Sequence, residues 1–559
     1  MDKEKYVLVV NNSYHENSAV LIKGKTIISG LEEERTSRNR HAVGEEASTC
    51  IKRLLEEENI TIEDIDELYI DIDDMLSEFD GEKIVRMFLT RRLGVKYMSK
   101  IKKLPKLVVN THNHHHARHA LASFYTSGFK SACSICIDGQ GDLNDSVTLS
   151  YIGEDGEIKL IKRFPDNCSL GRLYAIASNM VTGSRSEGKF MGLASFGRPR
   201  KELPLYYTED GECVDNISDK YGDNLEAYFL DNCYPFCQGN YGLYKDLLYY
   251  VDFAATIQEC INVSLLNLAK YMKKLYPSEK NLVLSGGVTL NCTANGILDQ
   301  ANIFENIFCF PATNDAGTAW GSAYYYLKKF CGVDSFPRLH APYYGPKYDV
   351  DNYIKLLIRQ NVPALVIEKI NSPQTIVEEI LKSGMVAWYQ DGSECGPRAL
   401  GHRSLLGDPR HVDNWKYISI DIKKREVYRP LAPIVLAEHY NEVFEDIHPD
   451  NLTEFMLKNV KIKKEWVNKI PAVCHVDFTA RPQLLYRETN PELYDVIEEF
   501  YKQTGIPLLI NTSFNNPGMP IVENIEEACA YIIKQKADKK NVVLFVDNKY
   551  KLYTKRVTG

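Results

Sequence analysis

The sequence predicts an α/β protein with at least two domains. Short runs of β-branched residues alternate with helical patterns along most of the chain, which is typical of α/β architectures. A chain of 559 residues is longer than one domain usually is, and a hydrophobic content of 44% is enough for full cores. Residues 336–346 contain three prolines and a glycine, so we place a domain boundary near Pro346.

Three elements of the first domain point to a ligand-binding cleft. Residues 5–21 read as a hairpin-like pair of strands around a polar turn, and residues 130–153 supply a second strand pair. Residues 281–291 read as a strand that ends in Gly286 and Gly287 before a helix. A double glycine lets the backbone approach a ligand closely, although alone it more often marks a tight turn. Together these elements resemble the plan of actin-like kinases.

Histidines are concentrated at the start of a predicted helix. Five of the 13 histidines lie in residues 112–119, and the helical pattern that follows stops at Gly128. Residues four apart share a helix face, so His115 and His119 would lie one turn apart. A strand-like run further along the chain ends in Asp138. Neutral imidazole and carboxylate suit a divalent transition metal, and we predict a metal site here.

Two alternatives fit the same histidine pattern. His112 and His116 are also four residues apart, so the spacing alone does not choose between the two pairs. The histidines could also form a polar, hydrogen-bonded helix start that binds no metal.

Composition favours a cytoplasmic enzyme. The N-terminal apolar run is too short for a signal peptide, and no apolar stretch approaches the roughly twenty residues of a membrane helix. A net charge of −8 argues against a broad nucleic-acid surface. We expect the 14 cysteines to be mostly reduced. Cys133 and Cys136 lie on a predicted strand and read as packing residues, with a redox pair or zinc knuckle as the alternative.

Cationic side chains gather among glycines and amides in the second domain. The strand-like residues 385–390 lead into a turn-rich stretch with three arginines, and further cations follow. Guanidinium groups bind phosphate oxygens in pairs, and nearby glycines expose backbone amides to the same anion. We predict a polyphosphate pocket, with surface salt bridges as the alternative for any single arginine. The candidate residues are Arg398, Arg403, Arg410, Lys423, Arg425, Arg429, Arg481, Asn511, Thr512, Ser513 and Asn515.

Eight motifs run from end to end of the chain. They are the residues at 14–19, 32–35 with Arg38 and His41, 115–120, 187–194, 285–288, 396–401, 429–433 and 511–515. In this order they resemble the NodU/CmcH family of O-carbamoyltransferases. The resemblance implies an N-terminal domain, residues 1–345, with the actin-like ATPase fold of the tRNA threonylcarbamoyl transferase Kae1. Residues 346–559 would form a C-terminal α/β domain similar to its activating partner YrdC.

The resemblance implies a reaction in two steps. In the YrdC-like domain, carbamoyl phosphate and ATP with Mg²⁺ would give carbamoyl adenylate. Preorganised cations fit this step, because charge concentrates on phosphate oxygens during nucleotidyl transfer. The adenylate would pass internally to the metal cleft of the Kae1-like domain, where the hydroxyl of a small natural product or sugar attacks it. No nucleic-acid or membrane partner is implied, and a homodimer is left open.

The resemblance also gives roles to residues of the first domain. The family's metal ligands map onto His115, His119, Asp138 and Asp315, which chooses between the two histidine pairs. The metal is then Fe²⁺, and Zn²⁺ would fit the same ligands. His15 matches the family's catalytic histidine and is expected to act as general base for the acceptor hydroxyl. Contacts to the adenylate or substrate are expected at Lys189, Gly286, Gly287 and Asn291.

The chain departs from the family at three places. Met519 stands where glutamate is common, Asn17 lies near a common aspartate, and residues 314–316 read Asn-Asp-Ala instead of Asp-Asp-Gly. None of these changes removes a metal ligand, but each could alter acceptor contacts or the handling of the adenylate. We expect variable loops that include residues 206–250 to recognise the acceptor.

Three other functions compete with O-carbamoyl transfer. One is a sugar kinase of the actin-like fold, which needs one nucleotide site and would leave the second-domain arginines unused. Another is a nucleotide- or carbohydrate-sensing regulator without turnover, which the retained metal ligands and arginines oppose. The third is tRNA threonylcarbamoylation, which fits the pair of domains but not the acidic net charge.

Overall fold

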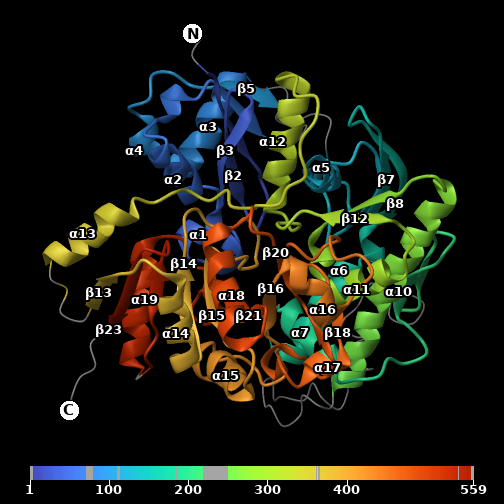
Figure 1. Ribbon diagram of the computed structural model, residues 1–559. Helices are drawn as coiled ribbons and strands as arrows, with labels where there is room; N and C mark the ends of the chain where they lie inside the picture. Colours follow the sequence, from blue (N-terminus) through green and yellow to red (C-terminus); the bar gives the residue numbers. More distant parts are fainter. Residues whose placement is uncertain are drawn as a thin grey trace.

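The computed structural model describes residues 4–70, 80–109, 114–183, 186–217, 250–360, 362, 365–538 and 540–554. The first half of the chain contains two five-stranded sheets, and the second half contains an eight-stranded sheet (Figure 1). Helices pack on each of these sheets. The predicted α/β class is therefore confirmed.

The first sheet joins its strands in the order β3-β2-β1-β4-β5. β1 and β2 pair antiparallel with Val10 opposite Ala19, which confirms the predicted hairpin with a polar turn at its tip. β4 lies parallel to β1, and β5 lies parallel to β4. The strands are β1 (Tyr6–Val10), β2 (Ser18–Lys23), β3 (Thr26–Glu32), β4 (Glu67–Ile70) and β5 (Lys106–Val109).

The second sheet repeats this plan in the order β8-β7-β6-β11-β12. β6, β7 and β8 pair antiparallel, β11 lies parallel to β6, and β12 lies parallel to β11. The turns after β1 and β6 therefore occupy equivalent places in the two sheets. The strands are β6 (Ala132–Ile137), β7 (Asp145–Ile152), β8 (Ile158–Pro165), β11 (Asn281–Ser285) and β12 (Asn306–Cys309).

Two helices, α5 (His115–Ser127) and α12 (Gly317–Phe330), lie between these sheets. Their apolar side chains share one core with Val9 of the first sheet and Val283 of the second. Gly321 lets α12 cross α5 closely, because a Cβ atom there would lie 2.0 Å from the carbonyl oxygen of Arg118. This packing brings the start of α5 and the start of α12 to the same cleft.

Further helices cover the outer faces of the two sheets. α2 (Thr49–Glu57), α3 (Gly81–Leu93) and α4 (Val95–Met98) pack on the first sheet. α6 (Leu170–Thr182), α7 (Glu187–Ala194), α10 (Val251–Leu275) and α11 (Cys292–Gln300) pack on the second. Cys133 and Cys136 are free, fully buried thiols on β6, in agreement with packing roles.

The third sheet runs in the order β13-β23-β22-β14-β15-β21-β16-β20. Its main helices are α14 (Pro373–Ser383), α18 (Pro491–Thr504) and α19 (Ile525–Ala537). Its strands are β13 (Leu365–Lys369), β14 (Met385–Tyr389), β15 (Arg403–Gly407), β16 (Ala432–Leu436), β20 (Gln483–Leu485), β21 (Leu508–Ser513), β22 (Leu544–Val546) and β23 (Tyr550–Thr554).

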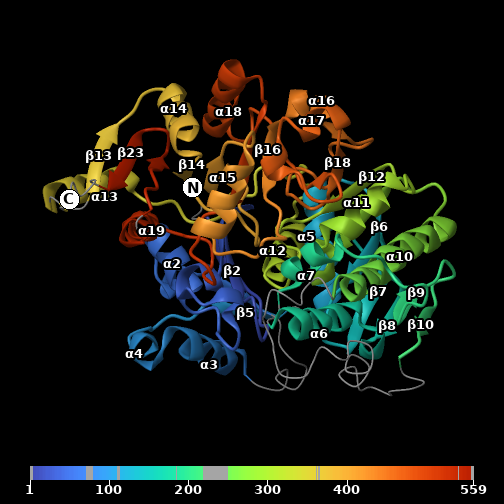
Figure 2. The ribbon, with the colours of Figure 1, turned by 90° about the horizontal axis from the view of Figure 1, so that it is seen from below.

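Residues 331–349 connect the halves without helix or strand, and α13 (Val350–Gln360) then joins the C-terminal core through Ile354. The predicted boundary near Pro346 falls in this segment, and the division into residues 1–345 and 346–559 stays a prediction. The C-terminal half lies against the N-terminal sheets (Figures 1 and 2), and Phe455 packs into the core of the second sheet. Among the described residues, no helix has the length and apolarity needed to cross a membrane.

Candidate functional site

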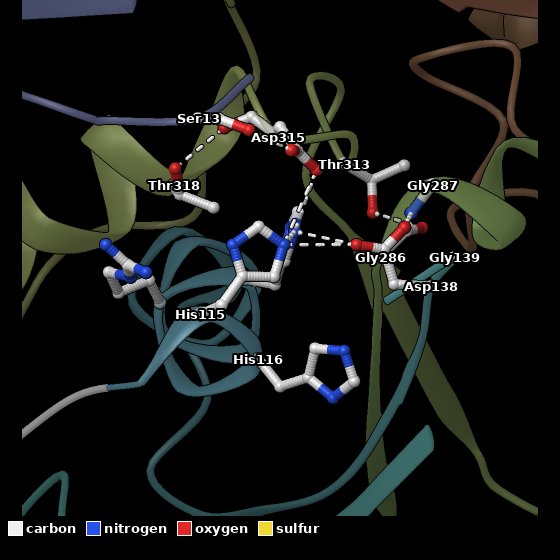
Figure 3. Close-up of polar contacts among 12 residues, drawn as sticks. Ser13, His115, His116, Asp138, Gly139, Gly286, Gly287, Thr313, Asp315 and Thr318 are labelled. Carbon is white, nitrogen blue, oxygen red and sulfur yellow. Dashed lines mark hydrogen bonds and ion pairs between the residues drawn. The ribbon is translucent and has the colours of Figure 1, made fainter. Parts of the chain in front are cut away.

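Four buried side chains converge in the cleft between the first two sheets (Figure 3). His115 and His119 come from the first turns of α5, Asp138 follows β6, and Asp315 lies just before α12. The Nε2 atoms of the two histidines are 3.0 Å apart. His115 Nε2 lies 3.1 Å from Asp138 Oδ2 and 3.5 Å from Asp315 Oδ1. One potential ligand atom from each residue lies within 4.8 Å of all the others.

Backbone and side-chain hydrogen bonds fix both carboxylates. The amide of Gly287 donates to Asp138 Oδ1 at 3.1 Å, and Ser13 Oγ donates to Asp315 Oδ2 at 2.5 Å. The double glycine therefore holds a predicted ligand. α5 ends at Gly128 in the left-handed conformation, as its sequence predicts.

The charges of this cluster favour a bound cation. Burial alone would lower the pKa of His115, but the carboxylates of Asp315 and Asp138 raise it well above its usual range. Burial would raise the pKa of Asp138, but hydrogen bonds to His115 and His119 hold it well below its usual range. Two carboxylates and two imidazoles facing one point form a donor set that fits a divalent transition metal.

The competing histidine pair cannot be assembled from the described residues. His112 lies outside them. His116 is buried beside Asp145, with Nδ1 3.6 Å from Oδ2, and it points away from the cluster (Figure 3). Burial lowers the pKa of His116 to about 4.

Gly286 has a backbone φ of +88°, which L side chains rarely adopt, and a Cβ atom there would lie 2.3 Å from the carbonyl oxygen of Ile137. We therefore expect Gly286→Ala to reduce the free energy of unfolding by at least about 2 kcal/mol and to displace Asp138. Thermal unfolding and metal content measure the two effects. Gly139→Ala is the matched control, since a Cβ atom at Gly139 meets no atom within 4 Å. Equal stability of the two variants would contradict this expectation.

His115, His119, Asp138 and Asp315 are called here the metal cluster, because their side chains could hold a metal ion, and His15 lies beside them in the turn after β1. The side chain of His15 is 46% exposed, and Nδ1 lies 3.7 Å from Glu16 Oε2 and 3.8 Å from Asp315 Oδ2. The nearby Glu16 carboxylate raises the pKa of His15 to about 9. Asn17 braces the same turn, because its side-chain amide donates to the carbonyl oxygens of Ser13 and Glu45, each at 2.7 Å.

Two neighbouring cavities lie between the halves of the chain. The first, of about 130 Å³, is lined by α7, the start of α11 and C-terminal residues that include Arg398, Arg481 and Thr512. The second, of about 290 Å³, extends from Glu16 and Asn314, near the metal cluster, to Lys423 and Pro520 in the C-terminal half. Both cavities are lined by Pro397, Arg398, Arg425, Arg429 and Ser513.

The predicted cations of these cavities have few carboxylate partners. Among the described residues, no carboxylate lines the first cavity. Burial and then Arg481 lower the pKa of Arg398 to about 9, and burial with neighbouring arginines lowers the pKa of Lys423 well below its usual range. Half-buried, mutually repelling arginines around the buried Lys423 favour the binding of an anion. The predicted residues that line one or both cavities are Arg398, Lys423, Arg425, Arg429, Arg481, Asn511, Thr512, Ser513 and Asn515.

Two predicted phosphate-binding arginines lie outside the cavity walls. Arg403 is fully buried, and its guanidinium donates to backbone carbonyl oxygens, including Gln390 at 2.6 Å and Asp391 at 2.7 Å. Arg410 pairs with Asp408 at 2.7 Å. Both side chains are used in holding the C-terminal half together.

The predicted first-domain contacts lie at three places. Gly287 donates its amide to Asp138, and Gly286 directly precedes Gly287. Lys189 lines the second cavity and forms an ion pair of 2.9 Å with Glu426. Asn291 caps α11 and exchanges hydrogen bonds of 3.0 Å with Gln258, so its amide is already paired.

Several cavity residues had no signal of their own in the sequence. Arg40 and Glu426 line the second cavity, and His475 lines the first. Arg40 begins a short 3-10 helix (Arg40–Ala42), Glu426 and His475 lie in loops, and none of the three belongs to a recognisable pattern. Met519, Asn314 and Ala316, three positions where the sequence departs from the expected pattern, all line the second cavity. Of the predicted acceptor loop, residues 218–249 lie outside the described residues.

Comparisons with known proteins cover nearly the whole chain. Residues 7–324 match the family model "Carbamoyltransferase N-terminus", and residues 377–549 match "Carbamoyltransferase C-terminus". Nodulation protein NolNO of Sinorhizobium fredii (strain NBRC 101917 / NGR234) is 33% identical over 93% of this chain and 76% of that protein. The 3'-hydroxymethylcephem-O-carbamoyltransferase of Amycolatopsis lactamdurans is 30% identical over 62% of this chain and 61% of that protein.

A solved structure, HypF of T. kodakarensis, aligns with a TM-score of 0.34 at 12% identity, covering 59% of this chain and 49% of that one. A score this low supports no conclusion. The family models and the NolNO relative support a conclusion about the family, because they span both halves of the chain. They therefore include both the metal cluster and the cations that line the two cavities. The chain belongs to the NodU/CmcH-type O-carbamoyltransferases and is an enzyme that transfers a carbamoyl group to a hydroxyl.

Proposed function

We propose that this enzyme makes carbamoyl adenylate in the first cavity, where hydrolysis of carbamoyl phosphate gives carbamate and phosphate, and the carbamate displaces pyrophosphate from ATP. It then transfers the carbamoyl group to a small hydroxyl compound beside the metal cluster, and AMP leaves. The observation that carries this proposal is the pair of cavities with shared walls. One cavity is lined by four arginines and no carboxylate among the described residues, and the other reaches the residues around His15 and Asp315. A sugar kinase needs one nucleotide site, so it would not need both cavities.

The first step needs phosphates held close to several fixed positive charges. Arg398, Arg425, Arg429 and Arg481 line the first cavity and would bind the phosphates of ATP, with its Mg²⁺, and of carbamoyl phosphate. Because these cations are already in place, little reorganisation is needed when charge develops on the phosphate oxygens. Asn511, Thr512 and Ser513 offer hydrogen bonds on the same wall.

The second step needs a polarised carbamoyl group and a base. Fe²⁺ or Zn²⁺ held by His115, His119, Asp138 and Asp315 would supply a Lewis acid to the carbamoyl or phosphate oxygen. His15 would take the proton of the acceptor hydroxyl, with Glu16 orienting its ring. A pKa of about 9 would keep His15 charged at neutral pH, but a metal cation held by Asp315 would offset the charge of that carboxylate and so lower this pKa.

The route between the two steps is internal in this proposal. The adenylate would move from the first cavity into the second along the five residues that line both, which include Arg398 and Arg429. It would then reach Asn314. Carbamoyl adenylate is a mixed anhydride that water hydrolyses, so a closed route protects it. The boundary at Pro346, Fe²⁺ as the metal and the cytoplasmic location remain predictions, and a homodimer remains open.

We expect His15→Ala to separate the two steps. A base for the acceptor hydroxyl acts only in transfer, so the variant should form adenylate at a near-normal rate and slow transfer by on the order of a hundredfold or more. Pyrophosphate release reports the first step. Carbon-13 carbamoyl phosphate, with a hydroxyl compound that the wild-type enzyme carbamoylates, reports the second.

The half-buried His439, which is paired with Glu442 at 2.9 Å and lines neither cavity, gives a matched control in His439→Ala. It should change neither step. Equal losses of adenylate formation and transfer in His15→Ala would show that His15 is structural or that the two steps share one site.

A further inference from the structure

One turn of the N-terminal half holds a loop of the C-terminal half that leads to Arg398. The turn is α1 (Glu33–Ser37) with its flanking residues, and the loop is residues 394–398, called here the arginine loop. Glu32 Oε1 accepts a hydrogen bond of 2.5 Å from the Gly396 amide. Arg35 Nη2 donates to the carbonyl oxygens of Gly396 at 2.7 Å and Glu394 at 3.2 Å.

Arg38 holds a second loop in the same way. Its Nη1 donates to the carbonyl oxygen of Ile521 at 2.7 Å, and its Nη2 donates to that of Pro520 at 2.9 Å. Nη1 also lies 3.1 Å from Glu527 Oε2. Pro520 and Ile521 line the second cavity. One turn of the N-terminal half therefore fixes a wall of each cavity.

The arginine loop is also held from its opposite side. Gly396 has a φ of +95°, and a Cβ atom there would lie 2.6 Å from the carbonyl oxygen of Pro311. Residues 311–314 lead directly to Asp315. The loop is thus enclosed between α1 and the segment that carries a predicted metal ligand, which leaves little freedom for the backbone next to Arg398.

Burial strengthens the hydrogen bonds from Arg35 to the arginine loop. Its side chain is 1% exposed, and Glu32 Oε2 lies 3.4 Å from its Nε. Burial would lower the pKa of Arg35, but Glu32, Glu523 and Glu394 raise it, so the guanidinium stays charged. Hydrogen bonds from a buried charge to backbone groups are costly to remove, because the backbone groups are left without partners.

We propose that Arg35 and Arg38 are positioning residues for adenylate formation, which they serve by holding the arginine loop and residues 520–521 against the N-terminal half. This inference rests on the proposed function. The arginines of the first cavity all belong to the C-terminal half, yet their spacing depends on a turn of the other half. Phosphate binding in one half is thereby coupled to the packing around the transfer site in the other.

The test is the steady-state rate of pyrophosphate release in the full-length enzyme with ATP and carbamoyl phosphate. We expect Arg35→Met to raise the KM for ATP about tenfold, in line with the loss of one hydrogen bond from a charged group. Arg35→Lys should recover part of this loss, and Arg38→Gln should show a smaller rise. Metal content should stay at the wild-type level in all three variants.

Arg92→Met is the matched control. Arg92 is also buried and charged, but its guanidinium bonds Asn12 at 3.0 Å and Glu46 within the N-terminal half. Its loss should lower the melting temperature and leave the KM for ATP unchanged. A purely structural role for Arg35 would give this same pattern.

Arg398→Ala is measured in parallel to separate two failures. If Arg398→Ala keeps pyrophosphate release, the proposed phosphate pocket is wrong. If it loses release while Arg35→Met and Arg38→Gln keep the wild-type KM for ATP, the positioning role alone is overturned. If Arg35→Met does not fold, Arg38→Gln decides, because its side chain is partly exposed and its loss should spare the fold.

Discussion

Arg398→Ala should abolish pyrophosphate release that depends on carbamoyl phosphate, with a loss of at least about a hundredfold. Arg398 is half-buried, lines both cavities and lies beside Arg481 and Arg429, and among the described residues no carboxylate lines the first cavity. Removing a preorganised charge that faces the reacting phosphates costs about two to three orders of magnitude in comparable cases. Pyrophosphate release and metal content are measured on the same protein.

Two further results belong to this experiment. Metal content should be unchanged, because the metal cluster lies in the other half of the chain. Arg487→Ala is the matched control: Arg487 is 47% exposed and paired with Asp495 and Glu498 on the surface, so its loss should leave the rate unchanged. Wild-type release in Arg398→Ala would place the phosphate site elsewhere.

His119→Ala should lose most of the bound metal and nearly all transfer, and should still make carbamoyl adenylate. The His119 Nε2 atom lies 3.5 Å from Asp138 Oδ2 and 3.6 Å from Asp315 Oδ1, so its removal takes away one of four converging donors. Transfer then falls because no Lewis acid is held beside the carbamoyl group. Metal analysis, pyrophosphate release and carbon-13 transfer give the three readouts.

His116→Ala is the sharpest comparison for this experiment. His116 is the immediate neighbour of His115 on α5, but it lies beside Asp145 outside the cluster. The His116→Ala variant should therefore keep the metal. The reverse result, with metal lost in His116→Ala and kept in His119→Ala, would contradict the proposed ligand set.

Local sequence patterns indicated part of the metal cluster without choosing its histidines. His115 and His119 lie one helical turn apart and Asp138 follows a buried strand, but His112 and His116 have the same spacing, and the resemblance to a family chose between the two pairs. Asp315 has no local pattern, because nearly two hundred residues separate it from α5 and only the packing of α12 brings it close. The resemblance to a family supplied this residue.

For the arginines, the sequence predicted more phosphate-binding residues than the cavities contain. Arg398, Arg403 and Arg410 have similar neighbours in the sequence, yet only Arg398 faces the cavities. Arg403 begins β15, where its guanidinium lies over the Tyr389 ring at 3.7 Å and donates to backbone carbonyl groups. Which way a charged side chain points depends on the register of β14 and β15, and composition does not contain that information.

The most direct measurement is mass spectrometry of the wild-type protein incubated with ATP and carbon-13 carbamoyl phosphate without an acceptor. Two half-reactions at two sites predict labelled carbamoyl adenylate together with pyrophosphate, and no product when either substrate is omitted. Formation of ADP without pyrophosphate would indicate kinase chemistry and contradict the account. Absence of any nucleotide product from protein that retains its metal would contradict it as well.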